Sequence, residues 1–143
     1  MPPPQAPPIG LHLASVARTV NRSFDAALAA AGGSLPTWLI LLNLRIGKGA
    51  NQRGLASAVG IREATLTHHL NALVEQGLVA RSRDPRNRRV QSVELTDDGD
   101  RLFEELRQAA TRFDTRLRRG LSSADLEALR GLLDRLRDNV SDG

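Results

Sequence analysis

The chain has 143 residues, a formal net charge of +4 and no cysteine, a length that suits one domain or one protomer of an intertwined oligomer. The lack of cysteine excludes disulfides, thiolate metal sites and a cysteine redox switch. The sequence contains neither a run of about 18 apolar residues nor a charged segment followed by an apolar core, so we expect no membrane span, no signal peptide and a cytoplasmic location.

The first elements are a proline-rich arm and a long helix. Residues 1–8 hold five prolines without apolar periodicity, which predicts a frayed tail or an arm that contacts a partner subunit. Residues 9–31 are expected to form a helix that Gly32 and Gly33 end. Its apolar residues fall on one stripe: Ile9, Leu13, Val16, Val20, Phe24, Ala27 and Leu28.

A second helix should follow, with Ser34 as its N-cap and Pro36 in its first turn. Residues 47–49 (Gly-Lys-Gly) end it. Because apolar side chains occur on more than one of its faces, we expect this helix to be buried. These side chains are Trp38, Leu39, Leu41, Leu42, Leu44 and Ile46.

Residues 51–76 read as two short helices joined by a tight turn. The first helix covers 51–58 with Asn51 as N-cap, the turn is residues 59–61 around Gly60, and the second helix ends at Gly77. This pattern predicts a helix-turn-helix. Leu55, Ala56, Val59 and Ile61 should pack on Leu66 and Leu70, and the buried side of the second helix should also include Leu73 and Val74.

The outer face of that second helix is small and polar, as a face that enters a major groove should be. His69 lies at the edge of the buried side, where a packing role is expected. The outer residues are Ala64, Thr67, His68, Asn71 and Glu75, flanked by Thr65 and Ala72.

Residues 78–95 read as a hairpin with strands at 78–83 and 89–95 and a turn at 84–88. The hairpin holds five arginines and two acids, whereas residues 96–143 hold nine bases and eleven acids. An arginine-rich tip suits phosphate contact and a narrow minor groove. A solvated charged turn is the alternative, which the preceding helix-turn-helix disfavours. The arginines are Arg81, Arg83, Arg86, Arg88 and Arg89.

Two helices should complete the chain. Thr96 is the expected N-cap of the first, which runs to Arg119 and closes at Gly120. Ser122 and Asp125 predict a capping box for the second. The apolar stripes of these helices and of residues 9–31 are too long for one small core, which favours pairing with a second chain; packing within one protomer is the alternative. The last stripe is Leu126, Leu129, Leu132, Leu133, Leu136 and Val140.

The stretch GLASAVGIREATLTHHLNALVEQGLVARSRDPRNRRVQSVELTDDG resembles the winged helix-turn-helix core of the MarR family of bacterial transcriptional regulators. Arg89 matches the family's wing arginine, and the junction from Leu95 through Thr96 to Gly99 also matches. Asn87 stands where the family usually has an Asp that braces the wing, and Val90 stands where Ser is usual. Asn87 hydrogen-bonds but forms no ion pair, so the resemblance leaves the wing-tip geometry open.

The resemblance implies a mainly α fold with a small β-hairpin wing, in which a winged helix-turn-helix core is flanked by N- and C-terminal dimerisation helices. The expected segments are a flexible arm at 1–8, a dimerisation helix at 9–33, the DNA-binding core at 34–95 and dimerisation helices at 96–143. The expected function is that of a homodimeric repressor on a pseudo-palindromic operator. The expected base-contacting residues are Thr65, Thr67 and His68, with Asn71 at the margin. Phosphates are expected to be held by Gln52, Arg53 and Arg62, and the wing contacts are expected from Arg86, Arg88 and Arg89.

By the same resemblance, a small phenolic or lipophilic ligand could release the DNA, with His12, Trp38 and Phe113 as candidate pocket residues. Core packing is the alternative role for Trp38 and Phe113. No cofactor, metal or enzymatic activity is expected, because the chain lacks a phosphate loop and its three histidines show no metal-ligand spacing. A sequence-tolerant architectural DNA binder and a winged-helix protein-interaction module stay open as other functions.

Overall fold

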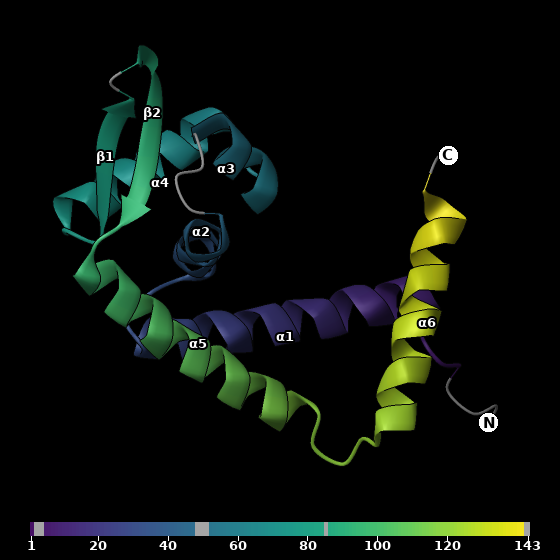
Figure 1. Cartoon of the computed structure of the whole chain (residues 1–143). Coiled ribbons are helices and arrows are strands. Elements are labelled where there is room, and N and C mark those ends of the chain that lie inside the picture. The colour runs from purple at the N-terminus through teal and green to yellow at the C-terminus, as the bar shows by residue number, and fades with distance from the viewer. Residues whose placement is uncertain (2–4, 48–51, 85, 142–143) are drawn as a thin grey trace. The chain divides into compact units, whose positions relative to one another are not determined.

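The computed structural model describes residues 1, 5–47, 52–84 and 86–141, and for residues 84 and 87–91 only the backbone. As expected, the described chain is mostly helical with one two-stranded antiparallel sheet (Figure 1). It divides into two compact units, residues 1–110 and 111–143. The elements are α1 (Ile9–Ala30), α2 (Leu35–Ile46), α3 (Gln52–Val59), α4 (Glu63–Glu75), β1 (Val79–Asp84), β2 (Asn87–Leu95), α5 (Asp97–Leu117) and α6 (Ser123–Val140).

The turn between α1 and α2 follows the predicted chemistry. Gly32 has a φ of +95° and ends α1, and the Ser34 Oγ accepts a hydrogen bond from the Thr37 amide at 3.2 Å at the start of α2. The Phe24 and Trp38 rings meet edge to face with centroids 6.0 Å apart, so the end of α1 packs on α2. The first half of α1 is exposed instead of covered by this unit.

The core of the first unit lies where the end of α1, α2, α3, α4, the hairpin and α5 meet. α2 is buried or half-buried at every residue from 35 to 44, as expected, although Ile46 at its end is 76% exposed. The core consists of Leu28, Ile40, Leu41, Leu44, Leu55, Ala56, Leu66, Leu70, Leu73, Val79, Val93, Phe103 and Leu106.

The helix-turn-helix forms with small shifts of its boundaries. Asn51, the predicted N-cap of α3, lies outside the described residues, and Val59 is the last helical residue instead of part of the turn. Gly60 has a φ of +81°, which explains the need for glycine in that turn. On α4, Val74 was expected on the buried side but is 37% exposed.

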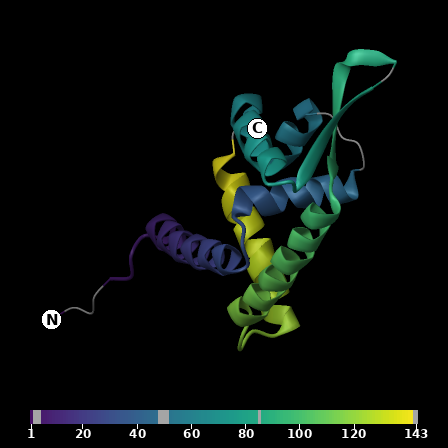
Figure 2. The same cartoon turned by 90° about the vertical axis from the view of Figure 1, so that its left-hand side faces the viewer.

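The hairpin strands differ from the predicted ones at the turn. β1 begins one residue later, at Val79, and β2 begins two residues earlier, at Asn87. Asp84 pairs with Asn87 after an irregularity in the register next to Arg83. The predicted five-residue turn at 84–88 was wrong. Asp84 and Asn87 are turn-forming residues by type, but both belong to the strand ladder. Figure 2 shows the hairpin standing out from the helices.

A tight junction joins the end of α4 to the start of α5. The Thr96 hydroxyl donates to the Gly77 carbonyl at 2.6 Å and accepts from the Gly99 amide at 3.1 Å, so the predicted N-cap also binds the chain that follows α4. A Cβ at Gly99 would lie 2.0 Å from the Leu78 carbonyl oxygen. Only glycine therefore permits this approach of α5 to the backbone after α4.

Arg45 makes a second link between α2 and α5. Its guanidinium pairs with Asp100 and lies over the Phe103 ring, 5.4 Å from the centroid. A cation held over an aromatic face adds to the ion pair. The C-terminal end of α2 is thereby tied to the first turns of α5, which are also fixed by Thr96.

The second unit contains the end of α5 and all of α6. α5 ends at Leu117, two residues before the predicted end. The predicted capping box is present: the Ser122 amide donates to Asp125 Oδ2 at 2.9 Å, and the Asp125 amide donates to Ser122 Oγ at 3.1 Å. These bonds from Ser122 hold the pKa of the Asp125 carboxyl below its ordinary value.

No single helix within the described ranges is long and apolar enough to cross a membrane; α1 and α2 satisfy length and composition only when taken together, as a pair bent by 71°.

We predict that Gly99→Ala lowers the free energy of unfolding by about 3 kcal/mol or more, because the new methyl group collides with a backbone carbonyl and not with a flexible side chain. Urea unfolding followed by circular dichroism measures the loss. Gly131→Ala in α6 is the control, since its Cβ would meet nothing within 4 Å; it should be neutral or raise stability by about 1 kcal/mol. Equal stability of the two variants would contradict the prediction.

Candidate nucleic-acid interface

The outward face of α4 presents polar side chains on a helix whose other side is fixed in the core. Leu66 and Leu70 are fully buried, which determines how the helix is rotated. Gly77, with a φ of +74°, ends the helix with amide bonds back to its last turn. The sequence placed seven residues on this outward face, and the exposed ones that carry polar groups include Thr65, His68 and Asn71.

Thr67 differs from the other predicted base-contacting residues, because its hydroxyl is already engaged. It donates to the Glu63 carbonyl at 2.9 Å and accepts a hydrogen bond from Gln52 Nε2. Gln52, which was expected to hold a phosphate, therefore ties α3 to α4. Because the hydroxyl proton is already used, the half-buried Thr67 can offer its methyl group, but no hydrogen-bond donor, to a further partner.

Two of the predicted phosphate-contacting arginines lie on the rim of the helix-turn-helix. The Arg53 side chain is 91% exposed and lies 3.7 Å from a Glu63 carboxylate oxygen. Arg62 is exposed and occupies the N-cap position of α4 without a side-chain capping bond. An ion pair this exposed is weak, so Arg53 can exchange Glu63 for a phosphate at little cost.

Arg81 links the hairpin to α4, a contact that the sequence analysis did not anticipate. Its Nη1 donates to Asn71 Oδ1 at 2.8 Å, and its Nε is buried with no hydrogen-bond partner among the described residues. Arg81 follows the buried Val79 by two positions on β1, and it pairs with the buried Val93 on β2. Strand alternation from Val79 was the signal that could have directed Arg81 toward α4.

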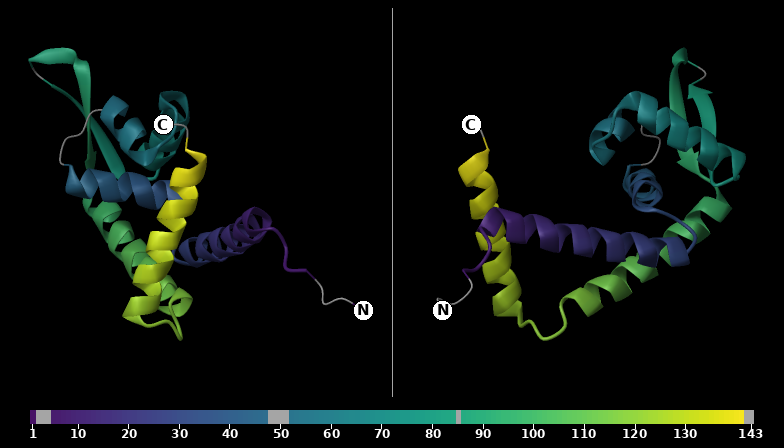
Figure 3. Two further views of the ribbon diagram at one scale, coloured as in Figure 1. Left: turned by 90° about the vertical axis from the view of Figure 1, so that its right-hand side faces the viewer. Right: turned by 180° about the vertical axis from the view of Figure 1, so that it is seen from behind.

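The structure describes the side chains of only some of the other hairpin arginines. Arg83 and Arg86 are exposed on the hairpin. The side chains of Arg88 and Arg89, both predicted to contact DNA, and of Asn87 lie outside the described part of the chain. Their backbone belongs to β2. Figure 3 shows the hairpin and α4 from behind, where β1 and β2 rise beside the helix.

The three candidate ligand-pocket residues have different surroundings. His12 is exposed on α1, and Phe113 is half-buried in the second unit. Trp38 packs against the core from α2, and its Nε1 is buried without a hydrogen-bond partner in the described structure. An indole N–H is a donor only, so Trp38 holds an unused donor beside Phe24.

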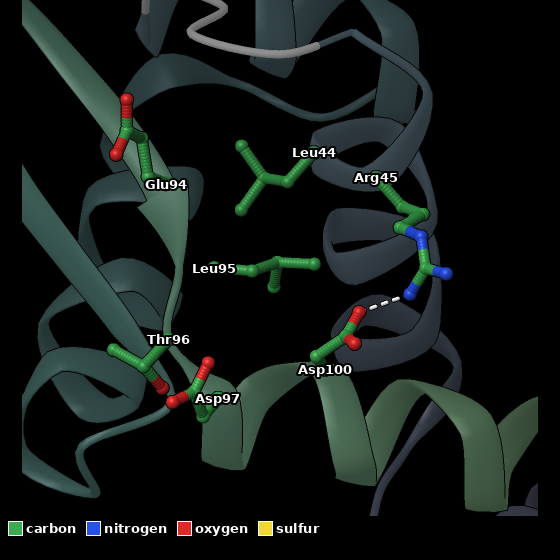
Figure 4. Close-up of a pocket in the computed structure, with 7 residues that line it drawn as sticks. All are labelled: Leu44, Arg45, Glu94, Leu95, Thr96, Asp97 and Asp100. Carbon is green, nitrogen blue, oxygen red and sulfur yellow. Dashed lines mark hydrogen bonds and ion pairs between the residues drawn. The ribbon is translucent and has the colours of Figure 1, made fainter.

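A hollow of about 320 Å³ lies elsewhere, between the end of α2, the end of β2 and the start of α5 (Figure 4). Leu44 and Leu95 form its apolar floor, and the Arg45–Asp100 pair closes one side. It carries three acids and one base, so its charge opposes that of the hairpin. None of the three ligand candidates lines it; its lining is Leu44, Arg45, Glu94, Leu95, Thr96, Asp97 and Asp100.

Within the described residues, no group of three or more histidine, aspartate or glutamate side chains is arranged to hold a metal ion. His68 and His69 have ring centroids 6.1 Å apart at an angle of 62°. Their side chains leave α4 in different directions, with His68 exposed and His69 half-buried.

Comparison with protein families matches residues 34–90 to the MarR family. The matched segment begins at the N-cap of α2 and ends within β2, so it contains the helix-turn-helix and most of the hairpin. The α4 face, the Thr67 and Gln52 pair and the Arg81–Asn71 contact all lie inside it.

Solved structures with the same fold include several MarR-family regulators. CouR, a transcriptional repressor bound to a 23-mer DNA duplex, is 28% identical, with a TM-score of 0.80 over 90% of this chain and 92% of CouR. A MarR-family regulator from Rhodococcus sp. RHA1 is 26% identical, with a TM-score of 0.74 over 90% and 91%. BpsR of Bordetella bronchiseptica, whose DNA binding is regulated by 6-hydroxynicotinic acid, is 25% identical, with a TM-score of 0.70 over 87% and 98%.

We predict that Thr67→Val lowers the free energy of unfolding by about 1 kcal/mol, because it removes a part-buried hydroxyl that bonds to two groups while keeping the shape of the side chain. Chemical denaturation of the purified protein measures the change. Thr67→Ser keeps the hydroxyl and should retain more of the stability than valine does. A valine variant as stable as the wild type would show that the bond from Gln52 does not hold α3 to α4.

Proposed function

Residues 34–90 form a MarR-family domain with a winged-helix fold, and on that premise we propose that this chain is a sequence-specific DNA-binding transcriptional regulator. It acts as a repressor and binds its operator as a homodimer. The observation that carries the proposal is the polar, exposed face of α4 beside an arginine-bearing hairpin. A helix of this kind fits the major groove, and the hairpin then reaches the adjacent backbone or minor groove.

Charge supports the same orientation toward DNA. Arg53, Arg62, Arg83 and Arg86 are exposed on the helix-turn-helix and hairpin. α5, which follows the hairpin in the chain, has three acids in its first turn, Asp97, Asp98 and Asp100. Phosphate contact is driven by the release of counterions from DNA, so these exposed arginines favour docking of DNA against the helix-turn-helix and hairpin.

Exposed apolar side chains on α1 and α6 support a homodimer. Leu132 is 59% exposed, and the first half of α1 exposes further large apolar residues. α6 has no buried residue at all in the described chain. Helical faces of this kind are normally covered by another chain, and a two-fold dimer would present two α4 helices to a pseudo-palindromic site with half-sites about one helical turn apart.

The proposal also includes a small-molecule effector that controls DNA binding. The DNA binding of BpsR, which is 25% identical to this chain, is regulated by 6-hydroxynicotinic acid. The Nε1 of Trp38, buried without a partner among the described residues close to where α1 packs on α2, would donate a hydrogen bond to a small aromatic acid. Such a ligand would release DNA by favouring a dimer geometry whose half-site spacing does not match the operator.

We predict that the purified protein binds DNA from upstream of its own gene at least about a thousand times more tightly than random duplex. Binding titrations at two salt concentrations, with random duplex as competitor, measure this ratio and the salt dependence. Tight binding to all duplexes with a steep salt slope would indicate an architectural DNA binder. Failure to bind any duplex would favour a protein-interaction module.

We also predict that Leu129→Glu combined with Leu133→Glu converts the dimer to monomers and weakens operator binding at least about 100-fold. Two carboxylates on the exposed apolar face of α6 would oppose its burial against a second chain. Sedimentation and operator titration measure the two effects. Arg130→Glu, which adds a carboxylate at another exposed position of α6, is the control and should remain dimeric. A dimeric double variant would contradict the assignment of α6 to the interface.

A further inference from the structure

Asn71 lies on the exposed face of α4 with one end of its amide already bound. Arg81 Nη1 donates to Asn71 Oδ1 at 2.8 Å. Arginine has five N–H donors and no acceptor, so the end of the amide that faces Arg81 must be the oxygen. The amino group, Nδ2, is therefore the end that remains for a partner outside the protein.

The surroundings hold this arrangement in place. Arg81 sits on β1 opposite the fully buried Val93 and two residues after the buried Val79. Its Nε is buried, so the base of the guanidinium lies against the protein while Nη1 reaches α4. One turn earlier on α4, the Thr67 hydroxyl donates to Glu63 and accepts from Gln52, so its one donor does not compete with Arg81 for Asn71 Oδ1.

The usual way in which asparagine reads DNA requires both ends of its amide. Oδ1 accepts from the adenine N6 amino group while Nδ2 donates to adenine N7. Arg81 occupies one of the two acceptor positions of Oδ1 and places a cation beside it, so the adenine N6 amino group must compete with Arg81 for this oxygen. Guanine, with acceptors at O6 and N7, and thymine, with an acceptor at O4, match a free amino group without needing Oδ1, whereas adenine keeps only the bond to N7 and loses strength in the bond from N6.

Resting on the proposed DNA-binding function, we propose that Arg81 is a positioning residue that sets the base preference of Asn71. Asn71 acts as a hydrogen-bond donor to a keto base, guanine or thymine, and does not select adenine. The specificity of α4 thus depends on a side chain of the hairpin that need not touch a base itself.

The test compares base preferences of full-length variants on an operator selected by the wild-type protein from a randomised duplex library. Asn71→Ala identifies the base pair that Asn71 contacts, because the preference there should flatten. At that position the wild type should prefer guanine or thymine over adenine at least about fivefold. Arg81→Met should remove this discrimination and raise relative binding to adenine at least about fivefold, because Oδ1 becomes free.

Two control variants distinguish the effect of Arg81 on the Asn71 amide from the effect of removing a positive charge. Arg83→Met removes a positive charge from an exposed side chain two residues along the same strand; it should weaken binding and reduce the salt slope while leaving base preference unchanged. Arg81→Lys keeps a donor for Oδ1 and should retain most of the preference for a keto base.

The outcomes are distinguishable from failure of the proposed function. If the wild type selects no operator, the DNA-reading function itself fails. If it selects an operator but Asn71→Ala alters no position, or Arg81→Met shows only the affinity and salt effects of Arg83→Met, the assignment of Arg81 is overturned while the function stands. A wild-type preference for adenine at the Asn71 position would also overturn it.

Discussion

The position of α4 in the fold depends on the junction between its C-terminal turn and the start of α5. A side chain at position 99 would meet the Leu78 carbonyl at 2.0 Å, and the Thr96 hydroxyl bonds to both Gly77 and the Gly99 amide. Gly77, Leu78, Thr96 and Gly99 are thus held together by the Thr96 hydroxyl and by a close approach of two backbone segments, which leaves little room for adjustment. The first turn of α5 is therefore fixed relative to the end of α4 and the start of the hairpin.

Three side-chain contacts at the surface add to the constraint that this junction places on α4 and its neighbours. Gln52 and Thr67 tie α3 to α4, Arg81 ties the hairpin to α4, and Arg45 ties α2 to α5. Each pair joins two elements that the core already brings together, and each is at least partly exposed. Their contributions to stability are therefore modest, and their larger effect is on how the polar groups of α4 are presented.

Local signals made much of this structure predictable from the sequence. The Ser34 cap, the capping box of Ser122 and Asp125, and the glycines at 60 and 77 depend on neighbours within a few residues, and all appear where expected. The hairpin boundaries were less predictable, because Asp84 and Asn87 favour turns by themselves but pair across the ladder. The contact between Arg81 and Asn71 needs the rotation of α4 and the strand register together, which no local pattern supplies.

The lone tryptophan has a consequence for observing the molecule in solution. The chain contains one Trp and no Tyr, so its near-ultraviolet emission comes from a single site where α1 packs on α2. There the indole N–H is buried without a partner in the described structure, with the Phe24 ring edge to face against it. Such an indole emits at short wavelength, and water or a polar acceptor reaching Nε1 shifts that emission to the red. The protein thus carries its own optical reporter of any event that separates these two helices.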